Sequence, residues 1–156
     1  MSHSTRLIDG SVSRDRTIVA DLLHDFNTEF GAPSPGPEVL AGRLETLLGG
    51  GSTLAIVAGE PAIGLALVTM RTNVWFDGPV ALLDELYVAP PFRGRGIGSS
   101  IMKAVEMACL LRGAELLEVN VDEPDHDAIR FYCRHGFSLV EPDTGQRAFY
   151  ISKPLA

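Results

Sequence analysis

The sequence predicts an α/β fold of the α+β kind, in a single domain spanning residues 1–156. We expect a mixed, mostly antiparallel sheet of about six to seven strands, with a parallel β-α-β unit in its core and about four flanking helices. Three observations predict it. Short apolar runs are bounded by glycine and proline, apolar residues between them recur at helical spacing, and 156 residues can bury roughly two thirds of the unfolded chain's surface.

The N-terminal third predicts one short strand and two helices. The strand candidate is Thr5–Asp9, and a first helix follows it. Its apolar face is Ile18, Val19, Leu22, Leu23, Phe26 and Phe30. The stretch "GAPSPGP" ends this helix because proline lacks a backbone donor. The second helix, which "GGGS" ends, is marked by Val39, Leu40, Leu44, Leu47 and Leu48.

The middle of the chain predicts a hairpin and then a β-α-β unit. The runs "TLAIVAG" and "AIGLALVTM" flank Gly59-Glu60-Pro61, as two buried strands flank a turn. Residues 79–88 form a further strand, a helix runs from Ile97 to a stop at Gly113, and Leu116–Val121 is again a strand. Strands joined through a helix are parallel, with a right-handed crossover.

The C-terminal stretch predicts a short helix and two more strands. The helix runs from about His126 to His135 and is closed by Gly136. The strand candidates lie around Ser138–Val140 and Arg147–Ser152.

Composition narrows the classes of function. The formal charge of −7 argues against nucleic acid as the main partner and favours small cationic substrates. Cys109 and Cys133 lie in helix-like apolar patterns, which indicates buried thiols in a reducing compartment. No metal-ligand spacing is present, and no apolar run reaches the length of a membrane span. We expect a cytoplasmic protein.

The stretch "PPFRGRGIGSS" predicts an anion site. Gly94, Gly96 and Gly98 expose backbone N–H groups, and the following helix directs its positive dipole end at them. Arg93 and Arg95 can add charge-assisted contacts to a phosphate. The simpler alternative is a tight turn with solvated arginines. The segment lacks the Gly-Lys-Ser/Thr of a Walker loop, and in the dinucleotide fingerprint its third glycine position falls on Ser99.

Two segments together resemble the GNAT superfamily of acetyl-CoA-dependent N-acetyltransferases. "LYVAPPFRGRGIG" matches the motif Arg/Gln-x-x-Gly-x-Gly/Ala through Arg93, Gly96 and Gly98. "AIRFYCRHGF" matches the family's later Ala-x-x-Phe/Leu-Tyr-x-x-x-Gly-Phe through Ala128, Phe131, Tyr132, Gly136 and Phe137. The resemblance covers residues 82–138, and the order of the preceding elements is also the family's.

The resemblance implies acetyl-CoA in a gap between the strand that ends at Val88 and the strand that ends at Val121. The main chain of Leu86, Tyr87 and Val88 would pair with the pantetheine like an added strand. The pyrophosphate arm would contact Arg93, Gly94, Arg95, Gly96, Ile97, Gly98 and Ser99. Further cofactor contacts map onto Asn120, Asp125 and Ala128, although an ionised Asp125 stands where many members have an asparagine and cannot donate a hydrogen bond.

Acetyl transfer to an amine needs a base for the ammonium and a proton for the departing thiolate. The resemblance assigns the proton donor to Tyr132. Asp84 and Glu85 are the candidate bases, Asp84 occupying the position of a candidate base in polyamine acetyltransferases. Regular alternation would send these two acids to opposite faces of the sheet. Solvated or hydrogen-bonded carboxylates at a sheet end are the alternative.

Fewer residues point to the binding site of the amine acceptor. Glu29, Phe30 and Trp75, with the neighbouring Phe76, lie in segments that line the acceptor pocket of the family. Shielding of the sheet from solvent is the equal alternative. We expect direct transfer of the acetyl group, in a ternary complex, to a primary amine of a small molecule rather than of a protein. Members of the family commonly form dimers, so the resemblance is also consistent with a homodimer. A non-catalytic acyl-CoA sensor and a nucleotide-dependent oxidoreductase are the other two hypotheses.

Overall fold

The computed structural model describes residues 3–155. The chain forms two compact units, the first running to Val119 and the second beginning at Asn120. Within the described residues, no helix is both long and apolar enough to cross a membrane.

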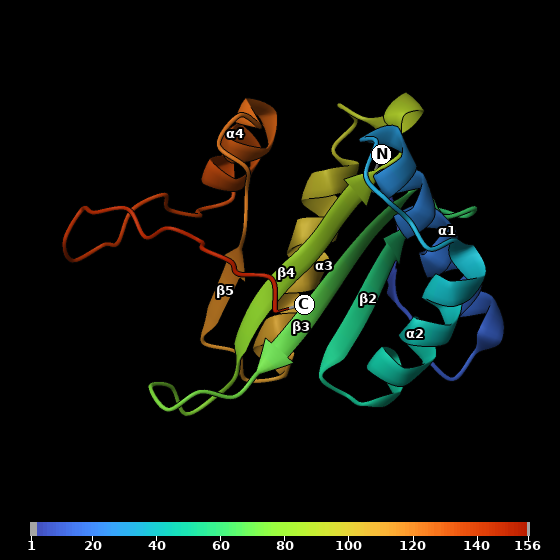
Figure 1. The fold of residues 1–156 in the computed structure, drawn as a ribbon, viewed down its shortest axis with the longest axis horizontal. Coiled ribbons are helices and arrows are strands. Elements are labelled where there is room, and N and C mark those ends of the chain that lie inside the picture. Colours follow the sequence, from blue (N-terminus) through green and yellow to red (C-terminus); the bar gives the residue numbers. More distant parts are fainter. Residues whose placement is uncertain (1–2, 156) are drawn as a thin grey trace. The chain divides into compact units, whose positions relative to one another are not determined.

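The first unit is built on a five-stranded sheet in the order β1-β2-β3-β4-β5 (Figure 1). Its strands are β1 (Thr5–Leu7), β2 (Thr53–Ala58), β3 (Gly64–Arg71), β4 (Val80–Val88) and β5 (Leu116–Val119). Neighbours are antiparallel except β4 and β5, which are parallel and joined through α3 (Ile97–Leu111). The predicted hairpin, the β-α-β unit and the mixed, mostly antiparallel sheet are confirmed.

Helices cover both faces of this sheet. On one face, α1 (Ser13–Glu29) and α2 (Pro37–Gly49) bury Val19 and Leu44 in a cluster with Val57 and Leu65 of the sheet. Helix α3 lies on the other face. Its Ile101 packs closely on Gly64 of β3, where an added Cβ would stand only 2.8 Å from the Ile101 side chain. All six residues of β2 are buried, as expected for a strand covered on two sides.

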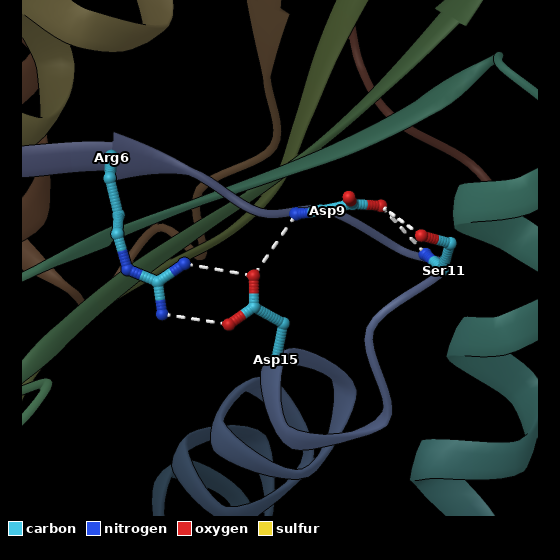
Figure 2. Close-up of polar contacts among 4 residues, drawn as sticks. All are labelled: Arg6, Asp9, Ser11 and Asp15. Atoms are coloured by element: carbon cyan, nitrogen blue, oxygen red, sulfur yellow. Dashed lines mark hydrogen bonds and ion pairs between the residues drawn. The ribbon is translucent and has the colours of Figure 1, made fainter.

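A buried carboxylate fastens β1 to the start of α1 (Figure 2). Both oxygens of Asp15 accept hydrogen bonds from the Arg6 guanidinium at 2.8 Å, and Oδ2 also accepts one from the Asp9 N–H at 3.1 Å. Asp9 in turn accepts hydrogen bonds from the N–H and hydroxyl of Ser11 at 2.9 and 2.7 Å. Hydrogen bonding to Arg6 lowers the pKa of Asp15, although burial opposes the shift. The charged form of Asp15 therefore stabilises this corner.

The second unit contains α4 (His126–Arg134), and the two strands predicted after it are absent from residues 138–155. In place of a strand ladder, the Gly145 N–H donates to Glu141 O and the Glu141 N–H to Gln146 O, which closes a turn. The apolar side chains Phe149, Tyr150 and Ile151 are exposed. The prediction was wrong because a strand requires a paired neighbour as well as β-forming residues. The described sheet accordingly has five strands, not six to seven.

Candidate functional site

The glycine loop presents bare backbone at the start of α3. Gly94 and Gly96 have φ values of 72° and 80°, in the left-handed region that favours glycine. Apart from the adjoining residues, no atom of residues 3–155 lies within 4 Å of the place where a Cβ would stand at either position. The helix begins at Ile97 without a side-chain cap, and its first hydrogen bond runs from the Ser100 N–H to Gly96 O. The N–H groups of such a first turn lack intrahelical acceptors, so this geometry suits an anion.

The two arginines of the loop occupy different surroundings. Arg95 is exposed, with its guanidinium carbon 5.7 Å from the ring centroid of Phe92. Arg93 instead turns back on the first unit, where it meets Glu29 at the end of α1 with N–O distances of 2.7 and 2.8 Å. Its Nε donates to the Val88 carbonyl at 2.8 Å. The structure thus brings together two residues for which the sequence predicted different roles. Glu29 was expected to line the acceptor pocket, and Arg93 to bind the pyrophosphate of acetyl-CoA.

Strand β4 continues past its parallel neighbour. Its pairing with β5 runs from Val80 opposite Leu116 to Leu83 opposite Val119, and β4 then continues to Val88. Within the described pairings, residues 85–88 are matched on the β3 side alone. The segment predicted to pair with a pantetheine, 86–88, lies within this stretch. An extended ligand can add to a strand in this way.

A β-bulge lies at the two candidate bases. Glu85 pairs with Leu67 and Leu83 pairs with the next residue of β3, Val68, so Asp84 is the extra residue of β4. A bulge interrupts the regular alternation of side chains, so the expectation of opposite faces does not apply at this point.

The bulge gives the two acids different environments. Asp84 is exposed and accepts a hydrogen bond from the Thr69 hydroxyl at 2.5 Å. Glu85 is half-buried, and burial raises the pKa of its carboxyl above the usual value, with the charge of Asp84 raising it further. A carboxylate with a raised pKa is the better proton acceptor near neutral pH.

The predicted acceptor residues fall at two ends of the first unit. Phe30 lies beside Glu29, next to the end of β4 that leads into the glycine loop. Trp75 lies in the loop before β4, where Asn73 Oδ1 accepts hydrogen bonds from the N–H groups of Trp75 and Phe76. The two loops extend from opposite ends of β4 in Figure 1, and nine residues of strand span about 30 Å. Trp75, 87% exposed, therefore does not join Glu29 and Phe30 in one pocket.

The second unit carries the remaining predicted residues. Asp125 caps α4, its Oδ1 accepting the Ala128 N–H at 3.0 Å. Tyr132 packs in an aromatic cluster, with ring centroids 5.4 Å from both Phe131 and Phe137. Asn120, at the start of this unit, is exposed.

The sequence of residues 19–137, which spans the glycine loop, the bulged strand and α4, matches the profile of the Acetyltransferase (GNAT) family. The chain belongs to the GNAT acetyltransferase family. The resemblance carried by the two motifs is thereby confirmed.

Solved structures share the GNAT fold over nearly the whole chain. A provisionally named acetyltransferase from Arthrobacter sp. FB24 is 47% identical, with a TM-score of 0.89, and the match covers 97% of this chain and 96% of that one. An aminoglycoside acetyltransferase from an uncultured soil metagenomic sample, solved with sisomicin, is 16% identical. It has a TM-score of 0.79 over 99% of this chain and 97% of its own, which shows the fold.

Curated GNAT relatives match over shorter stretches. The aminoalkylphosphonate N-acetyltransferase of Salmonella typhimurium is 34% identical over 84 residues, 54% of this chain and 54% of the relative. The thialysine N-epsilon-acetyltransferase of Bos taurus is 30% identical over 95 residues, 58% of this chain and 55% of the relative. The chain thus spans about half the length of these curated relatives.

One part of this GNAT chain was missed by sequence reasoning. Tyr87 was considered for its main chain alone, yet its ring is buried, stacks on Phe26 at 5.1 Å and lies 5.8 Å from the Arg93 guanidinium. The signal available in the sequence was the spacing of Phe26 and Phe30, four residues apart on one helix face.

Proposed function

We propose that this GNAT protein is an N-acetyltransferase that moves the acetyl group of acetyl-CoA to a primary amine, by direct transfer in a ternary complex. The observation that carries the proposal is the half-buried Glu85, whose raised pKa suits a general base, one residue before the stretch 86–88 of β4, which lacks a partner on the β5 side within the described pairings. The open glycine loop that follows β4 supports it from the donor side.

The chain's own residues account for donor binding. The N–H groups of the loop and of the first turn of α3, with Arg95, bind the pyrophosphate. The β4 backbone beyond the bulge orients the pantetheine arm. Acetyl-CoA supplies the acetyl group as a thioester.

Two side chains, Glu85 and Tyr132, carry out the proton transfers. Glu85 accepts one proton from the acceptor ammonium, directly or through a water, and leaves a neutral amine. The amine nitrogen bonds to the acetyl carbon as the carbon–sulfur bond breaks. Tyr132, in the position of the family's acid, gives its phenolic proton to the departing sulfur. The proton that the nitrogen loses as the amide forms then restores the Tyr132 phenol. The products are an N-acetyl amine and CoA with a free thiol.

The acceptor is a small amine rather than a protein. Relatives include enzymes named for aminoalkylphosphonate and for thialysine, both small molecules, and the formal charge of −7 favours cationic molecules.

A panel of amines tests the proposal by release of free CoA thiol, with mass spectrometry of each product. The panel holds an aminoalkylphosphonate, thialysine, a polyamine, an aminoglycoside and a peptide with a free amine. We expect at least one small amine to gain 42 mass units, the mass of an acetyl group replacing a hydrogen, at a rate that Glu85→Gln lowers about a hundredfold or more. Binding of CoA without thiol release for any amine would instead identify an acyl-CoA sensor. Asp84→Asn is the matched control, because it removes the neighbouring charge and keeps Glu85.

A further inference from the structure

The side chain of Arg93 is held on three sides. Two of its nitrogens contact the two oxygens of Glu29 at 2.7 and 2.8 Å, a forked arrangement that orients both groups. The third nitrogen, Nε, donates to the Val88 carbonyl at 2.8 Å. A phosphate that bound this guanidinium would have to compete with a carboxylate already in place.

Aromatic rings complete the surroundings of this ion pair. The guanidinium carbon of Arg93 lies 6.0 Å from the ring centroid of Phe30 and 5.8 Å from that of Tyr87, within the range of cation–π attraction. The Tyr87 side chain also lies beside Glu29. The side chains of Glu29 and Arg93 are 26% and 43% exposed, so the ion pair is partly exposed to solvent.

The location of this cluster separates it from the anion site. Tyr87 belongs to the core that packs under α1, whereas Ile97 and Ile101 of α3 pack against Gly64 on the other face of the sheet. The Arg93 side chain thus lies on the α1 side, while the bare N–H groups lie at the start of α3. Arg95, two residues on, makes no ion pair within residues 3–155.

We infer that Arg93 is a positioning residue, which through its ion pair with Glu29 fastens the glycine loop to the end of α1, and that it is not a ligand of the pyrophosphate. The inference deepens the proposed function and rests on it. Arg95 and the backbone N–H groups then supply the anion contacts. The same ion pair holds Phe30 beside the loop, so donor loop and the end of α1 are positioned together.

A double-mutant cycle on CoA binding, measured by calorimetry, tests this assignment without requiring turnover. The variants are Arg93→Gln, Glu29→Gln and the two combined. If the pair acts as one unit, each single variant weakens CoA binding about fivefold, and the double variant is no weaker than either single one. If Arg93 binds phosphate, Glu29→Gln frees it and leaves CoA binding unchanged or tighter, while Arg93→Gln alone weakens it. That pattern would overturn the inference.

The dependence of CoA affinity on ionic strength is the second readout, and Arg95→Gln is the matched variant. Removing a phosphate ligand reduces this dependence, so we expect a smaller salt effect in Arg95→Gln and an unchanged one in Arg93→Gln. Equal loss of salt dependence in both variants contradicts the assignment. Wild-type protein that fails to bind CoA would overturn the proposed function itself, which separates the two failures. Thermal melting of each variant confirms that it is folded.

Discussion

Replacing Glu85 by glutamine tests the proposed base most directly. A general base in the transition state contributes typically 10² to 10⁴ in rate, about 2.7 to 5.4 kcal/mol of barrier. Glu85→Gln retains the shape and removes the proton acceptor, so turnover should fall by a factor in this range. The CoA dissociation constant should stay within about twofold, because the side chain precedes the donor-binding stretch of β4.

The pH dependence of turnover provides a control for the assignment of Glu85 as the base. The pKa of Glu85 is raised first by burial and then by the charge of Asp84, so the base becomes ionised, and turnover rises, at a pH above the usual glutamate range near 4.3. Asp84→Asn removes the second cause and should move this rise to lower pH while keeping turnover high. Glu85→Gln should abolish the rise.

Glu85→Gln should lower turnover but raise the stability of the folded protein. A carboxyl whose pKa is raised by folding destabilises the native state increasingly as pH rises above its unfolded pKa, because the charged form is the disfavoured one. The variant should therefore melt at a higher temperature than wild type at pH 7. The assays are thiol release at saturating substrates from pH 5 to 10, and thermal unfolding. Turnover within threefold of wild type, with an unshifted acidic limb, would refute the assignment of Glu85.

Three further predictions concern the acid and the frame. Tyr132→Phe should lower turnover about a hundredfold or more with unchanged CoA affinity, and unchanged turnover would remove the acid role. Asp15→Asn should cost about 2 kcal/mol of unfolding free energy at pH 7 through the weakened contact with Arg6. Because folding lowers the pKa of Asp15, this difference is present above about pH 3.9 and shrinks as the pH falls below it, which denaturant titrations at pH 7 and pH 3 check. Gly78→Ala would place a Cβ 1.9 Å from the Gly113 carbonyl, and should cost about 3 kcal/mol and lower Tm by about 6 to 12 °C; a Tm unchanged within 2 °C would contradict that geometry.

Local patterns predicted the elements of the first unit well. The hairpin around Gly59, the β-α-β crossover and the glycine loop are each encoded by neighbouring residues, through turn chemistry and apolar spacing. The prediction of two strands after α4 was wrong because local patterns do not determine strand pairing. Their residues favour extended backbone, but pairing depends on which strand edge is available, and that is not a local property.

In the candidate site, too, some features follow from the sequence alone and others only from the tertiary structure. The sequence alone determined the family and its two motifs, because a bare backbone loop needs glycine and a helix needs its apolar spacing wherever the chain folds. Only the tertiary structure showed that Asp84 is the extra residue of a bulge, and that Arg93 reaches Glu29, 64 residues earlier in the chain. The physical reason is range: backbone preferences act between neighbours in sequence, whereas a charge responds to whichever groups the fold brings within a few ångströms.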